Sequence, residues 1–134
     1  MYENARMIAI DEKTLIICET DRSGKIRYAS DDLCRITGYS QEELLGKPYG
    51  VLWRADMPQS VFKDMWETIE SGAIWKGFVK SATKNGDYYW VYTTIFPIVS
   101  ANGEGYLSVR ARASDEEIER YEARYAQTRD KELQ

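Results

Sequence analysis

The sequence predicts an α+β fold: a five-stranded antiparallel sheet with short helices on one face and a C-terminal amphipathic helix. Period-two strand patterns form a pair near the N-terminus and a trio near the C-terminus, and turn residues such as Asn-Gly connect them. Capped helical segments fill the stretch between the two groups and follow the last strand. At 134 residues, the chain accommodates one domain of this kind.

Composition excludes several function classes. The 18 basic and 22 acidic residues leave a net charge of −4, and no local basic face predicts a nucleic-acid partner. No apolar run reaches the length of a membrane span, and the N-terminus lacks a signal-peptide core. We therefore expect a cytoplasmic segment without membrane contact, although a longer protein that contains it could be membrane-anchored.

The absence of histidine narrows the possible chemistry further. With 0 histidines, the chain has no Ser-His triad, no imidazole zinc set and no His-ligated haem. We expect no catalytic residues, no metal ligands and no enzymatic activity. Cys18 and Cys34 lie in apolar patterns far from any Cys-x-x-Cys spacing, which predicts buried reduced thiols over a redox or cross-linking pair.

The first strand pair opens the domain, which we expect to span residues 14–113. Residues 1–13 have no clear period and are interpreted as a leader or cap. Residues 14–20 form a β-branched apolar run, residues 21–24 a turn cluster, and residues 25–29 an alternating strand, which together predict a hairpin.

Helices follow this hairpin. Ser30 has the chemistry of an N-cap, and the helix that it opens should stop at Gly38. Residues 40–43 form a capping box for a second short helix, which closes at Gly46.

The longest interior helix is predicted over residues 56–72. Asp56 and Gln59 are its candidate caps, and Pro58 fits its first turn. One face of this helix is apolar and consists of Val61, Phe62, Met65, Trp66 and Ile69.

Three strands complete the predicted sheet. Residues 75–83 and 87–96 flank an Asn-Gly turn, and Pro97 should end their pairing. A second Asn-Gly turn at 102–103 leads to residues 106–112, where Leu107, Val109 and Ala111 share one side.

Residues 114–134 form a connector helix with a capping box at 114–117. Its apolar seam of Ile118, Tyr121 and Tyr125 is thin, so the helix either docks on the sheet or pairs with a second copy as a short coiled coil. Arg110 and Arg112 of the last strand lead into this cap through the junction at 112–115, and a homodimer is the expected assembly.

Several short motifs resemble the PAS domain family. They are Tyr-Ala-Ser at 28–30, Ile-Thr-Gly-Tyr at 36–39, Glu-Glu-Leu-Leu-Gly at 42–46 and Lys-Asn-Gly-Asp at 84–87. Asp-Met-Pro at 56–58, Trp-Lys-Gly at 75–77 and Asn-Gly-Asp-Tyr-Tyr-Trp-Val at 85–91 are similar to the aerotaxis-receptor branch of that family. This resemblance covers about residues 14–120.

The resemblance implies a sensor that holds FAD non-covalently and reports redox state or oxygen to a downstream signalling domain of the same receptor. Ser30, Trp53, Arg54, Asp56 and Trp75 occupy or adjoin positions where the family contacts its ligand. Independently, aromatic residues on the sheet and helices could wall a flat ligand. The expected cofactor-binding set is Ser30, Trp53, Arg54, Asp56, Phe62, Trp66, Trp75 and Trp90.

Three departures from the family pattern leave alternatives open. Ser30 replaces an amide, Trp53 replaces a guanidinium, and Arg54 supplies a positive charge one position along. Trp53 could fill the pocket of a cofactor-free module for dimerisation or docking, or of a sensor for another small ligand. Arg54 could be a solvated surface residue, Asp56 only a helix cap, and the aromatics ordinary core.

Overall fold

The protein, seen in a computed structural model that describes residues 4–134, forms the five-stranded antiparallel sheet that the sequence predicts. The strands lie in the order β2-β1-β5-β4-β3. In chain order the elements are β1 (Ile16–Asp21), β2 (Ile26–Ala29), α1 (Asp31–Thr37), α2 (Gln41–Leu44), η1 (Tyr49–Leu52), α3 (Gln59–Glu70), β3 (Trp75–Ala82), β4 (Tyr88–Ser100), β5 (Gly103–Arg112) and α4 (Asp115–Glu132).

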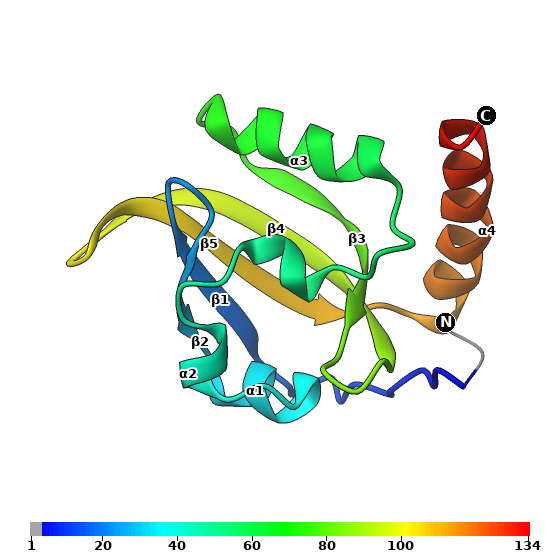
Figure 1. Cartoon of the computed structure of the whole chain (residues 1–134), viewed down its shortest axis with the longest axis horizontal. Helices are drawn as coiled ribbons and strands as arrows, with labels where there is room; N and C mark the ends of the chain where they lie inside the picture. The colour runs from blue at the N-terminus through cyan, green and yellow to red at the C-terminus, as the bar shows by residue number, and fades with distance from the viewer. Residues whose placement is uncertain (1–3) are drawn as a thin grey trace.

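The sheet has two differently covered faces. The face that packs against α1, η1 and α3 holds the main core and is called the inner face. The opposite, outer face carries a second cluster of Phe78, Trp90 and Ala113, which seam residues of α4 cover. Figure 1 shows α3 running along the sheet, while α4 stands beside the β3 side of the molecule.

The first short helix begins and ends as predicted, and the second begins as predicted but ends at Leu44, before Gly46. The Ser30 hydroxyl accepts a hydrogen bond from the Leu33 amide at 3.3 Å and caps α1, which ends at Gly38 with φ of 81°. Ser40 and Glu43 form the reciprocal capping box of α2. η1 was not predicted, because its four residues carry no cap or period of their own.

The pairing of β3 with β4 ends before Pro97, as predicted, but strand β4 itself continues past Pro97. β4 continues to Ser100, and Pro97 itself lies opposite Tyr106 of β5. Pairing with β3 stops at Ile95, so beyond that point β4 has a strand on one side only. Proline is tolerated there because its missing N–H costs no hydrogen bond on the open side.

The predicted caps of the long helix were wrong. α3 begins at Gln59 after Pro58, and no side chain of its own segment caps it. Instead, Glu132 from the last turn of α4 accepts hydrogen bonds from the amides of Gln59 at 2.8 Å and Ser60 at 3.1 Å. A carboxylate from a distant helix thus satisfies the donors that every helix N-terminus leaves open.

Of the two arrangements predicted for the connector helix, the structure has the docked one. Ile118, Tyr121 and Tyr125 pack on the outer cluster, and the Tyr125 ring stacks on Trp90 with centroids 5.9 Å apart. The Tyr125 hydroxyl donates to the Phe78 carbonyl at 2.7 Å. The capping box at Ser114 and Glu117 is present as predicted.

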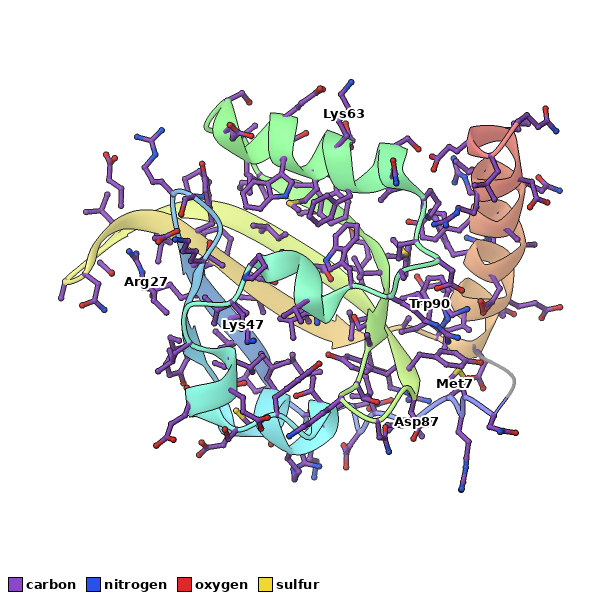
Figure 2. All side chains as sticks on the ribbon, in the orientation of Figure 1. Met7, Arg27, Lys47, Lys63, Asp87 and Trp90 are labelled. Carbon is purple, nitrogen blue, oxygen red and sulfur yellow. The ribbon has the colours of Figure 1, made fainter. Side chains whose placement is uncertain are left out.

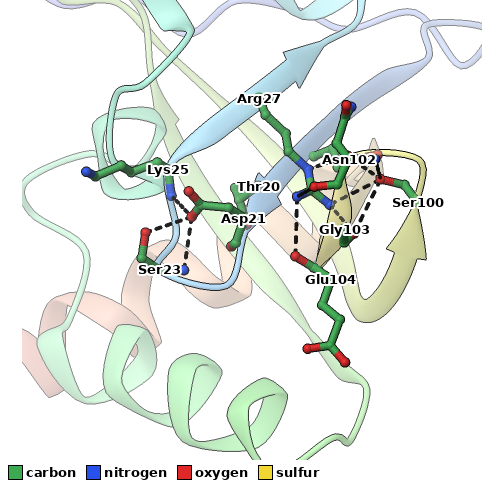
Figure 3. A network of polar contacts seen from close by, with 10 residues as sticks. Thr20, Asp21, Ser23, Lys25, Arg27, Ser100, Asn102, Gly103 and Glu104 are labelled. Atoms are coloured by element: carbon green, nitrogen blue, oxygen red, sulfur yellow. Dashed lines mark hydrogen bonds and ion pairs between the residues drawn. The ribbon is translucent and has the colours of Figure 1, made fainter.

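Arg27 clamps the two hairpins at the far end of the sheet. Its guanidinium pairs with Glu19 and donates to the carbonyl oxygens of Asn102, Gly103 and Glu104 at 3.0–3.2 Å (Figure 3). This half-buried arginine therefore has a carboxylate that balances its charge and carbonyl oxygens that accept its N–H groups, so its partial burial costs little stability.

The segment before β1 pairs with the start of β4. The Ile8 amide donates to the Tyr88 carbonyl at 2.8 Å, and the Tyr88 amide donates to the Arg6 carbonyl at 3.0 Å. The first three residues of the predicted leader or cap lie outside the described residues. Within residues 4–134, no helix is long and apolar enough to cross a membrane.

Candidate functional site

A row of aromatic rings lies between α3 and the inner face of the sheet. Trp53, directly after η1, meets Trp75 of β3 at 6.0 Å and the edge of Phe62 of α3 at 5.0 Å between centroids. The row continues from Phe62 to Trp66 at 6.2 Å and from Trp66 to Tyr106 of β5 at 6.0 Å. These edge-on and tilted contacts are the geometries that aromatic pairs prefer.

Two glycines make room for rings of this row. A Cβ on Gly24, which has φ of 88°, would lie 2.6 Å from the Trp66 ring, and a Cβ on Gly77 would lie 2.5 Å from the Trp75 ring. The Trp75 indole is also fixed by its Nε1, which donates to Asp64 at 3.0 Å. Backbone and hydrogen bonding therefore hold Trp66 and Trp75 in place, while Trp53 Nε1 has no hydrogen-bond partner among residues 4–134.

Two spaces adjoin the aromatic row. The inner cavity has a volume of only about 10 Å³, and its walls include Cys18, Tyr49, Trp66, Tyr106 and Ser108. An open groove of about 700 Å³ lies outside Trp53 and Phe62 and runs along the first turn of α3. The inner cavity has room for about one water molecule. Trp53 and Phe62 line the groove, whereas Trp66 and Tyr106 of the same row line the inner cavity.

The inner face is unusually polar for a sheet that faces the core. Its fully or nearly fully buried side chains include Thr20, Ser81, Thr93, Ser108 and Arg110. The Tyr49 hydroxyl, also buried, lies 3.0 Å from the Ser108 hydroxyl. Polar groups inside a domain cost stability unless they have partners, so a polar inner face needs a reason other than packing.

Arg110 is the most buried charged residue on this face. Its side chain is 1% exposed, and Nη1 donates to the Tyr89 hydroxyl at 3.1 Å. The Tyr49 ring lies 5.7 Å from its Cζ. Nε and Nη2 of Arg110 are buried and have no acceptor.

Arg54 and Asp56 belong to an ion cluster at the edge of the site. The Arg54 guanidinium is 5% exposed, lies 4.4 Å from the Tyr88 ring centroid and places Nε 3.3 Å from Asp56. The Lys80 ammonium lies 3.3 Å from a carboxylate oxygen of Asp56 and 2.6 Å from a carboxylate oxygen of Glu122 in α4. The cluster therefore connects the loop before α3, strand β3 and helix α4.

Neither cysteine is placed for thiol chemistry. Both thiols are free, and Cys18 is buried against the inner cavity. Burial raises the pKa of Cys18 to about 12, although the nearby Arg110 charge opposes this effect. Burial also raises the pKa of Cys34. A thiol with a raised pKa is mostly protonated at neutral pH and is a poor nucleophile.

The structure brings half of the predicted cofactor-binding residues together. Trp53, Phe62, Trp66 and Trp75 form the aromatic row. Arg54 and Asp56 adjoin the row at the ion cluster; Arg54 is buried, so a solvated surface role is wrong, and Asp56 does not cap α3. No group of residues in the range 4–134 forms a metal-binding cluster.

Ser30 and Trp90 lie away from that row. The Ser30 hydroxyl is used by the backbone around the start of α1. Trp90 packs under α4 on the outer face, and Figure 2 labels it on that side of the molecule. Successive side chains on a strand point to opposite faces, so Trp90 cannot share the inner face with Tyr89.

The sequence prediction missed Arg110 as a candidate site residue. Leu107, Val109 and Ala111 do share one side of β5, but Tyr106, Ser108 and Arg110 are the buried residues of that strand. The available signal was the alternation itself, which separates the two sets. The alternation does not say which set faces the core, and a rule that places apolar residues inside selects Leu107, Val109 and Ala111.

Comparisons with known proteins agree on one family. A family model described as the PAS fold matches residues 26–110. The chain is 38% identical over 125 residues to the aerotaxis receptor of Escherichia coli, covering 92% of this chain and 25% of the receptor. It is 31% identical over 110 residues to the biofilm dispersion protein of Pseudomonas aeruginosa, covering 81% of this chain and 26% of that protein.

A third relative and two solved structures extend this picture. The nitrogen fixation regulatory protein of Klebsiella pneumoniae is 30% identical over 95 residues, which are 71% of this chain and 19% of the relative. The PAS domain of a Colwellia psychrerythraea protein matches with a TM-score of 0.65 at 22% identity, covering 75% of this chain and 86% of that one. A variant of a fungal photoreceptor matches with a TM-score of 0.59 at 24% identity, covering 78% and 79% of the two chains. The chain thus spans about a quarter or less of the curated relatives.

Proposed function

Since this chain belongs to the PAS fold family, we propose that it is a cytoplasmic sensor domain that binds FAD non-covalently beneath α3. Redox state or oxygen is the signal, and a downstream signalling domain of the same receptor receives it. The domain is a binding and signalling module and not an enzyme. The observation that carries the proposal is the polar inner face, where buried donors lie beside aromatic rings.

The donor set suits a flavin. The aromatic row can stack against a flat ring, and the buried N–H groups of Arg110 can donate to its carbonyl and nitrogen acceptors. The outer groove has about 700 Å³ for the remainder of a dinucleotide, and Arg54 and Lys63 in its lining supply positive charge. The first-turn amides of α3 do not contribute, because Glu132 already accepts from them. A bound flavin would supply reversible electron transfer.

The small volume of the inner cavity requires a side chain to move before a flavin can bind. An inner cavity of about 10 Å³ does not hold a ring system, so the Trp53 or Phe62 side chain has to leave the row when the ligand enters. Trp53 is the better candidate, because its indole N–H has no partner, whereas Trp75 is held by Asp64. Trp53 would then exclude water in the absence of ligand and line the groove in its presence.

The output route follows β5 into α4. Arg110 lies on β5 under the site, and Ser114, four residues later, caps α4. α4 in turn contacts the site through Lys80–Glu122 at 2.6 Å and through Arg129, which donates to the Ala55 carbonyl at 2.7 Å. A change of a few kcal/mol at the site is enough to redistribute docked and undocked α4. In the homodimer that we propose, the undocked helix pairs with its copy.

Titration with FAD tests the proposal. We expect the flavin fluorescence to be quenched on binding, since a ring stacked on tryptophan loses emission, with a dissociation constant of about 10 μM or tighter. Riboflavin, which lacks the phosphates, should bind more weakly than FAD if the groove holds the dinucleotide part. Unchanged fluorescence of both flavins at a large excess of protein would contradict the proposal.

A second candidate function is favoured by the closed cavity. If Trp53 fills the pocket permanently, the domain is a cofactor-free module for dimerisation or docking, or senses a smaller ligand. Trp53→Ala decides between the two, with Trp53→Phe as the matched control that keeps a ring. In a flavin sensor, wild type binds FAD and Trp53→Ala binds it about tenfold more tightly, because no indole has to be displaced. In the cofactor-free module, wild type does not bind.

A further inference from the structure

Arg110 carries a charge that the protein itself does not balance. Among residues 4–134, no carboxylate forms an ion pair with its guanidinium, and the side chain is 1% exposed. Its polar neighbours are the hydroxyls of Tyr49 and Tyr89 and the thiol of Cys18. Burial raises the pKa of Tyr89 and of Cys18, so both groups remain neutral at physiological pH. An arginine stays protonated, so a full positive charge is left inside the domain.

The hydrogen bonds of Arg110 are also incomplete. Within the part of the chain that the structure describes, Nη1 has the Tyr89 hydroxyl as an acceptor at 3.1 Å, while Nε and Nη2 have none. Arg27 shows what a satisfied arginine looks like in this fold, with Glu19 and three carbonyl oxygens as partners. A buried cation without a partner costs several kcal/mol, and a guanidinium fork without acceptors adds to that cost.

Arg110 lies next to residues that line the inner cavity. The cavity is lined by three neighbours of Arg110, namely Cys18, Tyr49 and Ser108. The Tyr49 ring lies 5.7 Å from Cζ of Arg110, and Ser108 precedes Arg110 by two residues on the same face of β5. We infer that Arg110 is the ligand-recognition residue of the interior, and that it receives the acceptor edge of the ligand through Nε and Nη2. This inference rests on the proposed function, because it assigns a partner to a ligand beneath α3.

The inference defines the chemistry of the ligand. Two adjacent donors in one plane match a ligand edge with two neighbouring acceptors, such as paired carbonyl oxygens or a carbonyl beside a ring nitrogen. A flavin offers that pattern on its pyrimidine ring. Negative charge that gathers on this edge during reduction would be stabilised by Arg110, so the residue should also raise the midpoint potential of the bound ring.

Arg110→Met tests the inference, with Arg112→Met as the matched control. Arg112 lies two residues along β5 but is exposed and pairs with Glu12 at the surface. We expect Arg110→Met to weaken binding of both FAD and riboflavin by about tenfold or more, since hydrogen bonds to a charged group are involved. Arg112→Met should match wild type. Removal of an unbalanced charge should leave the denaturant midpoint of the ligand-free chain unchanged or higher.

Arg110→Lys is a second variant, which keeps the charge but loses the planar fork. It keeps the inference testable if Arg110→Met does not fold. We expect its affinity for FAD to fall between those of wild type and Arg110→Met, and the midpoint potential of the bound ring to become more negative. If wild type binds FAD and both variants bind it equally well at an unchanged potential, the inference is wrong and the proposed function stands. If wild type binds neither FAD nor riboflavin, the proposed function itself fails, and the inference fails with it.

Discussion

Ser30 illustrates how much a single side chain can do without touching a ligand. Its hydroxyl accepts from the amides of Leu33 at 3.3 Å and Ile17 at 3.0 Å, and donates to the Leu15 carbonyl at 3.0 Å. The residue thereby joins the end of β2, the start of α1 and strand β1. Family resemblance places a ligand contact at this position, but all three hydrogen bonds of Ser30 go to the backbone.

We therefore predict that Ser30→Ala acts on stability. The free energy of unfolding should fall by about 2 kcal/mol, because a helix cap and two further backbone hydrogen bonds are lost. Ser40→Ala is the control, since the Ser40 hydroxyl accepts only the Glu43 amide at an exposed helix start, and its cost should be about 1 kcal/mol. Urea unfolding measures both variants. A loss of FAD affinity in Ser30→Ala without a loss of stability would contradict this account.

Arg110 and Tyr89 show the limit of sequence reasoning at this scale. Alternation along β4 and β5 divides residues between two faces, and this division could be predicted. The inner set of β5 is the more polar one, Tyr106, Ser108 and Arg110, so a rule that puts apolar residues inside selects the wrong face. Such an inversion is expected where a site, and not packing, determines the sequence.

At the level of elements, α3 and α4 depend on each other. α3 has no cap from its own segment, and the Glu132 carboxylate of α4 accepts from the Gln59 and Ser60 amides and from the Ser60 hydroxyl at 2.7 Å. These hydrogen bonds lower the pKa of Glu132. Because the outer groove runs past the same turn of α3, the end of α4 forms part of the entrance to the site.

Glu132→Gln should loosen this junction. The amide side chain keeps one acceptor but loses the charge that complements the helix N-terminus, so we expect amide hydrogen exchange at Gln59 and Ser60 to become about fivefold faster, which corresponds to about 1 kcal/mol. Glu119→Gln changes an exposed carboxylate of the same helix and serves as the control. Equal exchange in the two variants would show that α4 does not hold α3 in solution.

The elements themselves could be predicted to different degrees. Caps and turns were read correctly because they depend on neighbours in sequence, as at Ser40 and Gly38. The cap of α3 comes from a residue more than seventy positions away, and the extension of β4 past Pro97 depends on where β3 stops pairing. Both features are set by tertiary contacts, which a local pattern does not contain.

For the molecule as a whole, the fold and its family could be recognised from the sequence, and the state of the site could not. The docking of α4 was one of two predicted arrangements, and the thin seam of Ile118, Tyr121 and Tyr125 was compatible with both. The contacts that decide for docking, such as Tyr125 with the Phe78 carbonyl, join residues from separate elements. The small volume of the inner cavity likewise depends on side chains from separate elements, such as Cys18, Met65 and Tyr106.

The central claim is that the interior beneath α3 takes a redox-active flavin, and a visible absorption spectrum tests it most directly. The purified chain is incubated with FAD, separated from free FAD, and measured in air, after dithionite, and after air is readmitted. The account predicts a protein-bound flavin spectrum that bleaches on reduction and returns on reoxidation. A chain that emerges colourless after incubation with excess FAD would contradict it.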